Sequence, residues 1–386
     1  MEFQRIDEKS FSGNVKLLKL FGLYPYSSCP KIYPFYAYTF YVLFTCPTPI
    51  LCIVNLFFLE EKTLQRIVDT FFMITQIGIL IVKLLPFKNN PEGVLVDKCV
   101  KTCKNIFHLF YAFCLATLFT WPLKVFFNER RILPVEVWLP FNAYENSRIY
   151  YAVFFFVWLC VANAAGGNAA LDTLVAGLIY HAATQVAILK DTLQHLARTV
   201  DDQIEEESKM MSEAEKNELR SRTIYKKICE CIDHYDAIDQ FVKYLEKTYS
   251  FVVFTQFVAS IFVICISCLQ LSIVEPFTVP FFAMVIFVTT MLTEIYLYCY
   301  YGTVLYEECY IFSLRLQSDS IINAIYMSEW YNYDNKSKKA LITLMERAKR
   351  PMVVTAGKLL DLSLVTFTMI IRRSYSLLAV LKNYSN

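Results

Sequence analysis

The sequence predicts an all-α polytopic membrane protein with seven transmembrane helices, a cytoplasmic N-terminus and an extracellular C-terminus. Hydrophobic residues make up 56% of the 386 residues and charged residues only 19%, whereas a soluble domain is roughly 45–50% apolar. The mean hydropathy is +0.39. The apolar residues gather in runs that reach the length of about 20 residues that a membrane-spanning helix needs.

The apolar runs can be placed in order along the chain. The first is expected to kink at Pro47 and Pro49, because proline lacks an amide donor. Residues 1–24 predict a short amphipathic helix at the inner membrane surface, and 199–222 predict a short charged loop. The spans are expected at 33–59, 64–87, 105–127, 148–167, 249–273, 277–301 and 353–381.

Helical patterning continues beyond bilayer depth after the fourth and sixth spans, and it precedes the fifth. These extensions predict a cytoplasmic anchor region beneath the membrane. The predicted organisation has four parts: a cytoplasmic N-terminal segment, helices one to six with a ligand pocket, an amphipathic anchor helix, and a seventh helix with a short tail. Their bounds are 1–32, 33–330, 331–352 and 353–386.

The distribution of basic residues sets the predicted orientation. Lysine and arginine concentrate in the loops on the cytoplasmic side of a membrane protein. The candidate inner connections 88–104, 190–227 and 336–350 are rich in both. The candidate outer loops hold only Lys62, Arg130, Arg131 and Arg148. This asymmetry places the N-terminus inside, and seven spans then place the C-terminus outside.

The stretch 330–382 organises the rest of the chain. Its first part, 337–350, is amphipathic at helical spacing and should end before Pro351. Its second part, 353–381, is a predicted span interrupted by the charged residues Lys358, Asp361, Arg372 and Arg373. Charges at membrane depth are costly unless they face protein or water. One interpretation is an anchor helix whose charges extend to the membrane surface, and the other is a helix that lines a water-filled path.

The polar residues do not predict an enzyme or a metal site. The ionisable residues inside the predicted spans are scattered over different helices, and no phosphate-binding loop or nucleophile elbow occurs. Cys229 and Cys231 precede His234, but no second pair of ligands follows. The formal net charge of +2 indicates no nucleic-acid partner. The absence of an internal repeat disfavours a transporter. We therefore expect no cofactor.

The aromatic residues point instead to a ligand. The chain has 32 phenylalanines and 26 tyrosines, which cluster near the outer ends of several predicted spans. An apolar, aromatic-lined pocket with a few hydroxyl groups suits a small volatile organic molecule. Thr75, Thr117 and Thr120 could supply those hydroxyls. The alternative is that many of these aromatics form interfacial belts against the lipid.

Several short motifs follow one another near the end of the chain. They are Ser328-Glu329-Trp330-Tyr331, Arg347-Ala348-Lys349-Arg350-Pro351, Thr355-Ala356-Gly357, Leu362-Ser363, Phe367 and Ser374-Tyr375-Ser376. Their order and spacing over about fifty residues resemble the C-terminal signature of insect odorant receptors, and weaker similarity extends over the whole chain. The resemblance implies a plasma-membrane protein of sensory neuron dendrites.

The resemblance also implies a pocket and a pore. Spans two, three, four and six would enclose the odorant in the outer half of the membrane, and the last helix would line the pore of a tetramer. The ligand-binding residues carried over are Phe71, Phe72, Cys114, Thr117, Trp121, Phe155, Trp158, Phe281 and Val285, with Thr75 as a further candidate. The pore and gate residues are Arg373, Ser374, Leu378 and Leu381, of which Leu378 matches the family's hydrophobic constriction.

The family contains one shared co-receptor and many odorant-tuned subunits. This chain resembles a tuned subunit, because 199–222 is much shorter than the corresponding co-receptor loop. Arg372 and Arg373 also occupy positions that are apolar in the co-receptor, and four copies of this pair around one axis would repel one another. The predicted function is therefore the odorant-binding subunit of a heteromeric ligand-gated cation channel.

Two alternatives remain at this point. A gustatory-type receptor of the same superfamily would share the architecture and differ in ligand class. A G-protein-coupled receptor would have the opposite orientation. The chain has no Asp-Arg-Tyr after the third span and no cysteine between residues 127 and 148, where such a receptor usually has one.

Overall fold

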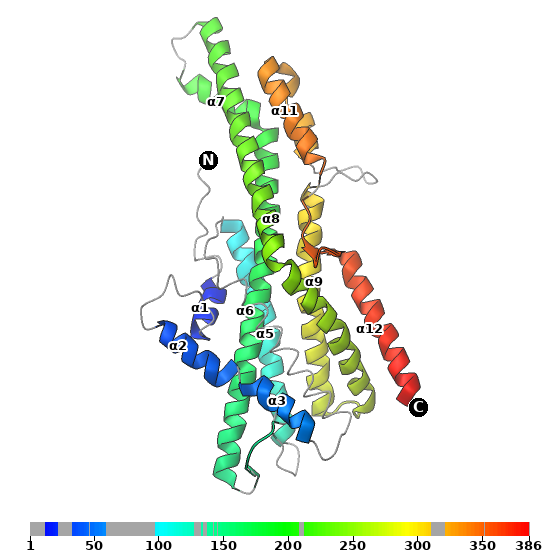
Figure 1. Ribbon diagram of the computed structural model, residues 1–386. Helices are drawn as coiled ribbons and strands as arrows, with labels where there is room; N and C mark the ends of the chain where they lie inside the picture. The colour runs from blue at the N-terminus through cyan, green and yellow to red at the C-terminus, as the bar shows by residue number, and fades with distance from the viewer. Residues whose placement is uncertain are drawn as a thin grey trace.

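A computed structural model describes the chain as an elongated bundle of helices (Figure 1). The described residues are 12–21, 33–45, 47–58, 97–126, 133, 137–141, 143–144, 146–207, 212–309, 321–350 and 352–385. The predicted second span, at 64–87, lies outside them. The all-α prediction is confirmed, with one short two-stranded hairpin as the exception among the described residues.

The elements follow the predicted order with different bounds. They are α1 (Ser12–Leu20), α2 (Tyr33–Phe40), the π-helix η2 (Tyr41–Thr45), α3 (Pro47–Phe58), α5 (Asp97–Phe126), α6 (Ser147–Gln194), α7 (Leu196–Glu207), α8 (Glu213–Ile273), α9 (Val279–Cys309), α10 (Ile321–Met327), the 3₁₀ helix η3 (Trp330–Asn332), α11 (Asn335–Ala348), β1 (Thr355–Ala356), β2 (Leu360–Asp361) and α12 (Leu364–Ser385).

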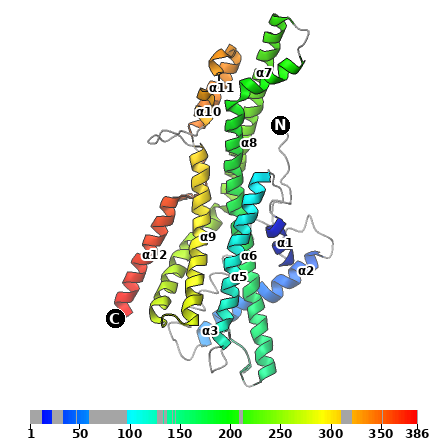
Figure 2. The ribbon, with the colours of Figure 1, turned by 180° about the vertical axis from the view of Figure 1, so that it is seen from behind.

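The longest helices run far beyond the thickness of a bilayer. α6 has 48 residues and α8 has 61, which at 1.5 Å per residue gives lengths of roughly 70 and 90 Å. Within the described residues, four helices are long and apolar enough to cross a membrane: the stretch Thr102–Thr120 of α5, and α6, α8 and α9. The extensions of α6 and α8 rise together beside α11 (Figures 1 and 2), so the helical extensions predicted after the fourth span and before the fifth are present.

The first predicted span departs from a regular α-helix just before the prolines at which it was expected to kink. α2 passes into the π-helical turn η2, and α3 is described from Pro47. Proline is favourable at the first position of a helix, since its missing N–H has no intrahelical acceptor there.

The predicted N-terminal helix, α1, is present and packs against α6. The side-chain amide of Asn14, which is 2% exposed, donates to the carbonyl of Ala170 and to the hydroxyl of Thr173, both at 2.7 Å. A Cβ on Gly166 would lie 2.3 Å from the ring of Phe21. Glycine in α6 therefore permits the close approach of the end of α1.

The charged segment 199–222 is not the loop that the sequence predicted. α7 extends to Glu207, and α8 begins at Glu213 behind Ser212. The Ser212 hydroxyl accepts from the Glu215 N–H at 3.4 Å, and the Glu215 carboxylate accepts from the Ser212 N–H at 3.0 Å. This reciprocal pair is a capping box. The Ser-x-x-Glu pattern in the sequence indicates the N-terminus of a helix at this position.

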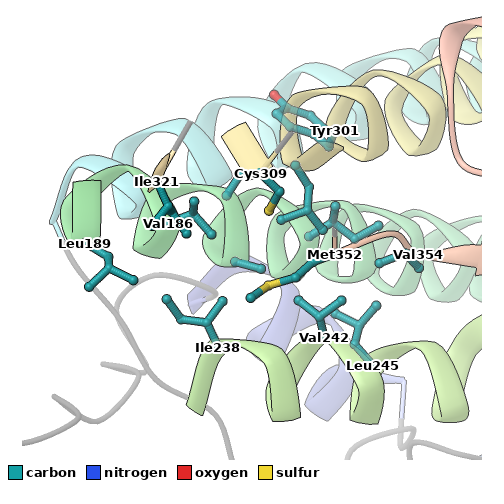
Figure 3. Close-up of a cluster of buried hydrophobic side chains, with 14 of the residues drawn as sticks. Val186, Leu189, Ile238, Val242, Leu245, Tyr301, Cys309, Ile321, Met352 and Val354 are labelled. Atoms are coloured by element: carbon teal, nitrogen blue, oxygen red, sulfur yellow. The ribbon is translucent and has the colours of Figure 1, made fainter. Parts of the chain in front are cut away.

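The end of the molecule at which α11 lies is held by a continuous apolar core. Figure 3 shows buried side chains from α6, α8, α9, α10 and the segment after α11 converging on one another. α11 adds Leu341, Leu344 and Met345 to this core. An ion pair joins Arg347 of α11 to Asp236 of α8, in which one guanidinium nitrogen, Nη1, donates to both carboxylate oxygens at 2.6 and 2.8 Å. The amphipathic prediction for 337–350 is thus confirmed.

The prediction of one continuous helix over 353–381 is wrong. Residues 352–363 instead form the β1–β2 hairpin, and α12 begins at Leu364. Gly357 and Lys358 both have left-handed backbone angles, with φ of 62° and 57°, which a helix cannot accommodate. Lys358 and Asp361 therefore belong to a turn and a strand. They do not interrupt a transmembrane helix.

Candidate functional site

Three of the four helices expected to enclose the ligand pack against one another. α5, α6 and α9 contact each other pairwise. The fourth is the predicted second span, whose residues lie outside the described part of the chain. Phe71, Phe72 and Thr75 belong to that span and are therefore not described either. The site can therefore be examined on three of its sides.

A pair of hydroxyl groups joins two of these helices. The Oγ1 atoms of Thr117 on α5 and Thr290 on α9 lie 3.2 Å apart. Thr290 is 3% exposed, so the contact is inside the bundle. Thr117 was predicted from the sequence and Thr290 was not. The cluster Thr289, Thr290 and Thr293 within an apolar run was the signal that could have identified it.

Trp158 of α6 is held by a break in the hydrogen bonding of α5. Residue 122 is proline and has no N–H, so the carbonyl of Leu118 lacks its usual donor four residues later. The indole Nε1 of Trp158 donates to that carbonyl at 3.3 Å. The Trp158 ring also lies 6.1 Å from Phe119 and 6.0 Å from Phe155, centroid to centroid. Proline in one helix therefore positions an aromatic side chain of another.

The remaining predicted pocket residues occupy different environments. Cys114 and Phe281 are half-buried. Phe155 is 61% exposed and Val285 is 36% exposed, so their side chains face away from the closely packed helix contacts. Trp121 lies in α5, but its side chain is outside the described residues. The structure thus places Thr117 and Trp158 each in a contact between two helices, and their role in ligand binding stays a prediction.

A second polar contact lies in the core where α6, α8 and α9 meet. The Tyr298 hydroxyl donates to the Asp172 carboxylate at 2.7 Å, and both side chains are 1% exposed. Phe257 of α8 packs edge-on to Tyr298, with ring centroids 6.3 Å apart. A hydrogen bond compensates part of the cost of burying a polar group. This contact ties α6 to α9.

The predicted pore residues lie on a helix that leaves the bundle. α12 packs on α8 and α9 and then diverges from the other helices towards the C-terminus (Figure 1). Arg372 and Arg373 are exposed, Ser374 is buried and donates to the carbonyl of Ile370 at 3.0 Å, and Leu378 is half-buried. The side chain of Leu381 lies outside the described residues. An exposed arginine pair at the middle of an apolar helix needs water or protein beside it.

The cysteine and histidine residues near the start of α8 do not gather around a metal. Within the described residues, no group of three or more His, Cys, Asp or Glu side chains could hold a metal ion. The Nε2 atom of His234 lies 2.9 Å from Oε1 of Gln185 on α6. His234 therefore serves as a helix-to-helix contact in this structure.

The helices described above define a multi-pass helical membrane protein, and comparison with known proteins identifies its family. A family model described as 7tm Odorant receptor matches residues 92–375. The chain therefore belongs to the insect odorant receptor family.

Individual relatives agree with this assignment. The chain is 22% identical over 360 residues to Odorant receptor Or1 of Anopheles gambiae, covering 85% of this chain and 84% of that protein. It is 25% identical over 285 residues to Odorant receptor 94a of Drosophila melanogaster, covering 73% and 66%. Its fold is similar to that of the olfactory receptor OR5 of Machilis hrabei in complex with eugenol, with a TM-score of 0.74 at 13% identity over 98% of this chain and 100% of that chain. The family is one of receptors and not of enzymes.

Proposed function

We propose that this chain is the odorant-binding subunit of a heteromeric ligand-gated cation channel in the plasma membrane, assembled with the shared odorant co-receptor. The family assignment favours this function over the gustatory-type and G-protein-coupled alternatives. The observation that carries the proposal is the environment of α12. Its arginine pair and much of its apolar surface are exposed in the isolated subunit, so the helix requires neighbours or water that a single chain does not supply.

The proposed ligand is a small volatile organic molecule held between α5, α6 and α9. The Thr117–Thr290 pair offers hydroxyl groups, and Trp158 with Phe119 offers aromatic surface. Such a combination suits a mostly apolar ligand with one polar group. Phe71, Phe72 and Trp121 are proposed to complete the pocket.

Co-expression tests the proposed assembly. Cells that express this chain with the co-receptor should show odorant-evoked cation current, and cells that express this chain alone should show none. The physical reason is the repulsion among four copies of Arg372 and Arg373 around one axis, which would disfavour cations in the pore. Robust odorant-evoked current from this chain alone would contradict the proposed stoichiometry.

The orientation is tested separately. A C-terminal epitope should be accessible to antibody on unpermeabilised cells, and an N-terminal epitope should be hidden, because basic residues concentrate in the candidate inner connections. The reverse labelling pattern would contradict the inverted topology and the proposed position of the pocket in the outer half of the membrane.

A further inference from the structure

One face of α9 holds the beginning of α12. Tyr296, Cys299, Gly302 and Thr303 recur at intervals of three and four residues, which places them on a single face of the helix. Each of them contacts the segment 362–367. We call these four residues the docking stripe. The predicted pocket residues Phe281 and Val285 lie near the other end of the same continuous helix.

The first two residues of the docking stripe, Tyr296 and Cys299, make an aromatic contact and a thiol contact. The rings of Tyr296 and Phe367 meet edge to face, with centroids 5.7 Å apart and planes at 73°. The Cys299 thiol, which is fully buried, interacts with the backbone of Ser363 and Phe367. These contacts hold the first turn of α12 against α9.

The last two residues of the docking stripe, Gly302 and Thr303, fix the point at which α12 begins. Leu364 is the first residue of α12, so its N–H has no acceptor within the helix. The Thr303 hydroxyl accepts from that N–H at 3.0 Å. A Cβ on Gly302 would lie 2.2 Å from the carbonyl oxygen of Leu362. The hairpin can therefore reach this position only because residue 302 is glycine.

The hairpin is held from its other side by α8. The Gly357 N–H donates to the carbonyl of Ser250 at 2.9 Å, and the Lys358 N–H donates to the Ser250 hydroxyl at 3.3 Å. The Thr355 hydroxyl donates to the carboxylate of Glu246. The hairpin is thus clamped between α8 and α9, while the far part of α12 is not: Tyr375 is 71% exposed and Val380 is 51% exposed.

We infer that the docking stripe is the contact through which α9 sets the position of α12, so that Gly302 and Thr303 are positioning residues of the gate. The inference rests on the proposed function, because it assumes that α12 lines a pore and that α9 borders the ligand. A displacement of α9 beside Thr290 is carried along one helix to Thr303, and it moves α12 at its fixed end. A small change of angle at this end becomes a larger displacement near Leu378.

The decisive variant is Thr303→Val, expressed with the co-receptor. It keeps the shape of the side chain and removes the acceptor for the Leu364 N–H. We expect the ratio of open to closed channels at saturating odorant to fall about fivefold, the factor by which one ordinary hydrogen bond alters an equilibrium constant, and the open fraction to fall with it. Thr303→Ser keeps the hydroxyl and should restore the parent's open fraction. Surface amounts are measured and used to normalise every current.

A matched control and a second variant complete the test. Thr293→Val removes a hydroxyl that donates to the carbonyl of Thr289 in the same helix, at 2.8 Å, and should leave the open fraction unchanged. Gly302→Ala should displace the hairpin and abolish the odorant-evoked current of channels that reach the surface. A pocket variant such as Thr290→Val should instead shift mainly the odorant concentration for half-maximal response, which separates positioning from binding.

Two failures can be told apart. If the parent gives no odorant-evoked cation current with the co-receptor, the proposed function is wrong. If the parent conducts and Thr303→Val has the same open fraction as the parent and as Thr303→Ser, the role of the docking stripe is overturned while the proposed function stands. A reduced open fraction in Thr293→Val equal to that in Thr303→Val would also overturn it.

Discussion

α11 and α12 follow one another in the sequence, but they differ in how much of their apolar surface is buried within the subunit. In α11, Leu341 is 2% exposed and Leu344 is fully buried in the core shared with α6 and α8. In α12, Val365 is 77% exposed and Tyr375 is 71% exposed. Apolar burial is a main source of folding free energy. This difference indicates that α11 contributes to the folding stability of the subunit. The exposed apolar surface of α12 instead needs contacts from outside the subunit.

The largest effect is expected from the covered helix. Leu344→Ala removes a fully buried side chain and should lower the free energy of unfolding by about 2–5 kcal/mol. Ile342→Ala on the same helix, where the side chain is 52% exposed, should change it by less than about 0.5 kcal/mol. The melting temperatures of the purified variants, compared with that of the parent, report the change in stability for Leu344→Ala and for Ile342→Ala. Equal melting temperatures would contradict the assignment of Leu344 to the core.

The uncovered helix should behave in the opposite way. Tyr375→Ala should leave the melting temperature of the isolated subunit nearly unchanged, because the ring makes few contacts within it. The amount of co-receptor that copurifies should fall at least about threefold, since aromatic side chains contribute strongly at buried interfaces. If Tyr375→Ala lowers the melting temperature but leaves the amount of copurified co-receptor unchanged, the proposed difference between α11 and α12 is contradicted.

A smaller effect is expected at the proposed constriction. Leu378→Ala should increase the odorant-free cation current, because a smaller apolar side chain lowers the barrier to wetting. The increase should be partial, since the co-receptor subunits keep their own apolar residues. Leu359→Ala is a suitable control, because that side chain lies in the hairpin and is 75% exposed. Channels as silent at rest as the parent would remove Leu378 from the gate.

The smallest effect concerns the covered region in which α11, α6 and α8 share a core. Burial lowers the pKa of His234 below its ordinary value of 6.5. The folded protein therefore binds fewer protons than the unfolded chain as the pH falls through 6.5, and its stability decreases there, by at most about 1.4 kcal/mol per pH unit. Above that range the contribution of His234 is constant. His234→Gln should flatten the fall in melting temperature between about pH 6.5 and 5. An unchanged slope would contradict this role.

Much of the architecture was predictable because helix patterning depends on local sequence. The extensions of α6 and α8, the irregular first span with its prolines and the amphipathic α11 all follow from spacing and from proline chemistry. The capping box at Ser212 could also have been recognised from the sequence, and it would have predicted a helix in place of the expected loop. The prediction of seven spans remains open, since the second lies outside the described residues.

The errors arose where tertiary contacts override apolar composition. Residues 352–363 are apolar enough to continue a helix, but Ser250 and Gly302 on distant parts of the chain favour a hairpin. In the candidate site, Thr117 and Trp158 could be named from one helix each. Their partners Thr290 and the Leu118 carbonyl could not, because pairing between helices is set by packing rather than by spacing.

The length of α6 has a consequence for the membrane in which the receptor resides. Between Arg148 and Lys190, Asp172 is the one Asp, Glu, Lys or Arg residue, and it is buried. This stretch is roughly 60 Å long at 1.5 Å per residue, about twice the hydrocarbon thickness of a bilayer. α6 therefore sets no fixed depth for the subunit. A thicker, sterol-rich membrane and a thinner one can both be accommodated along it with little cost from mismatch.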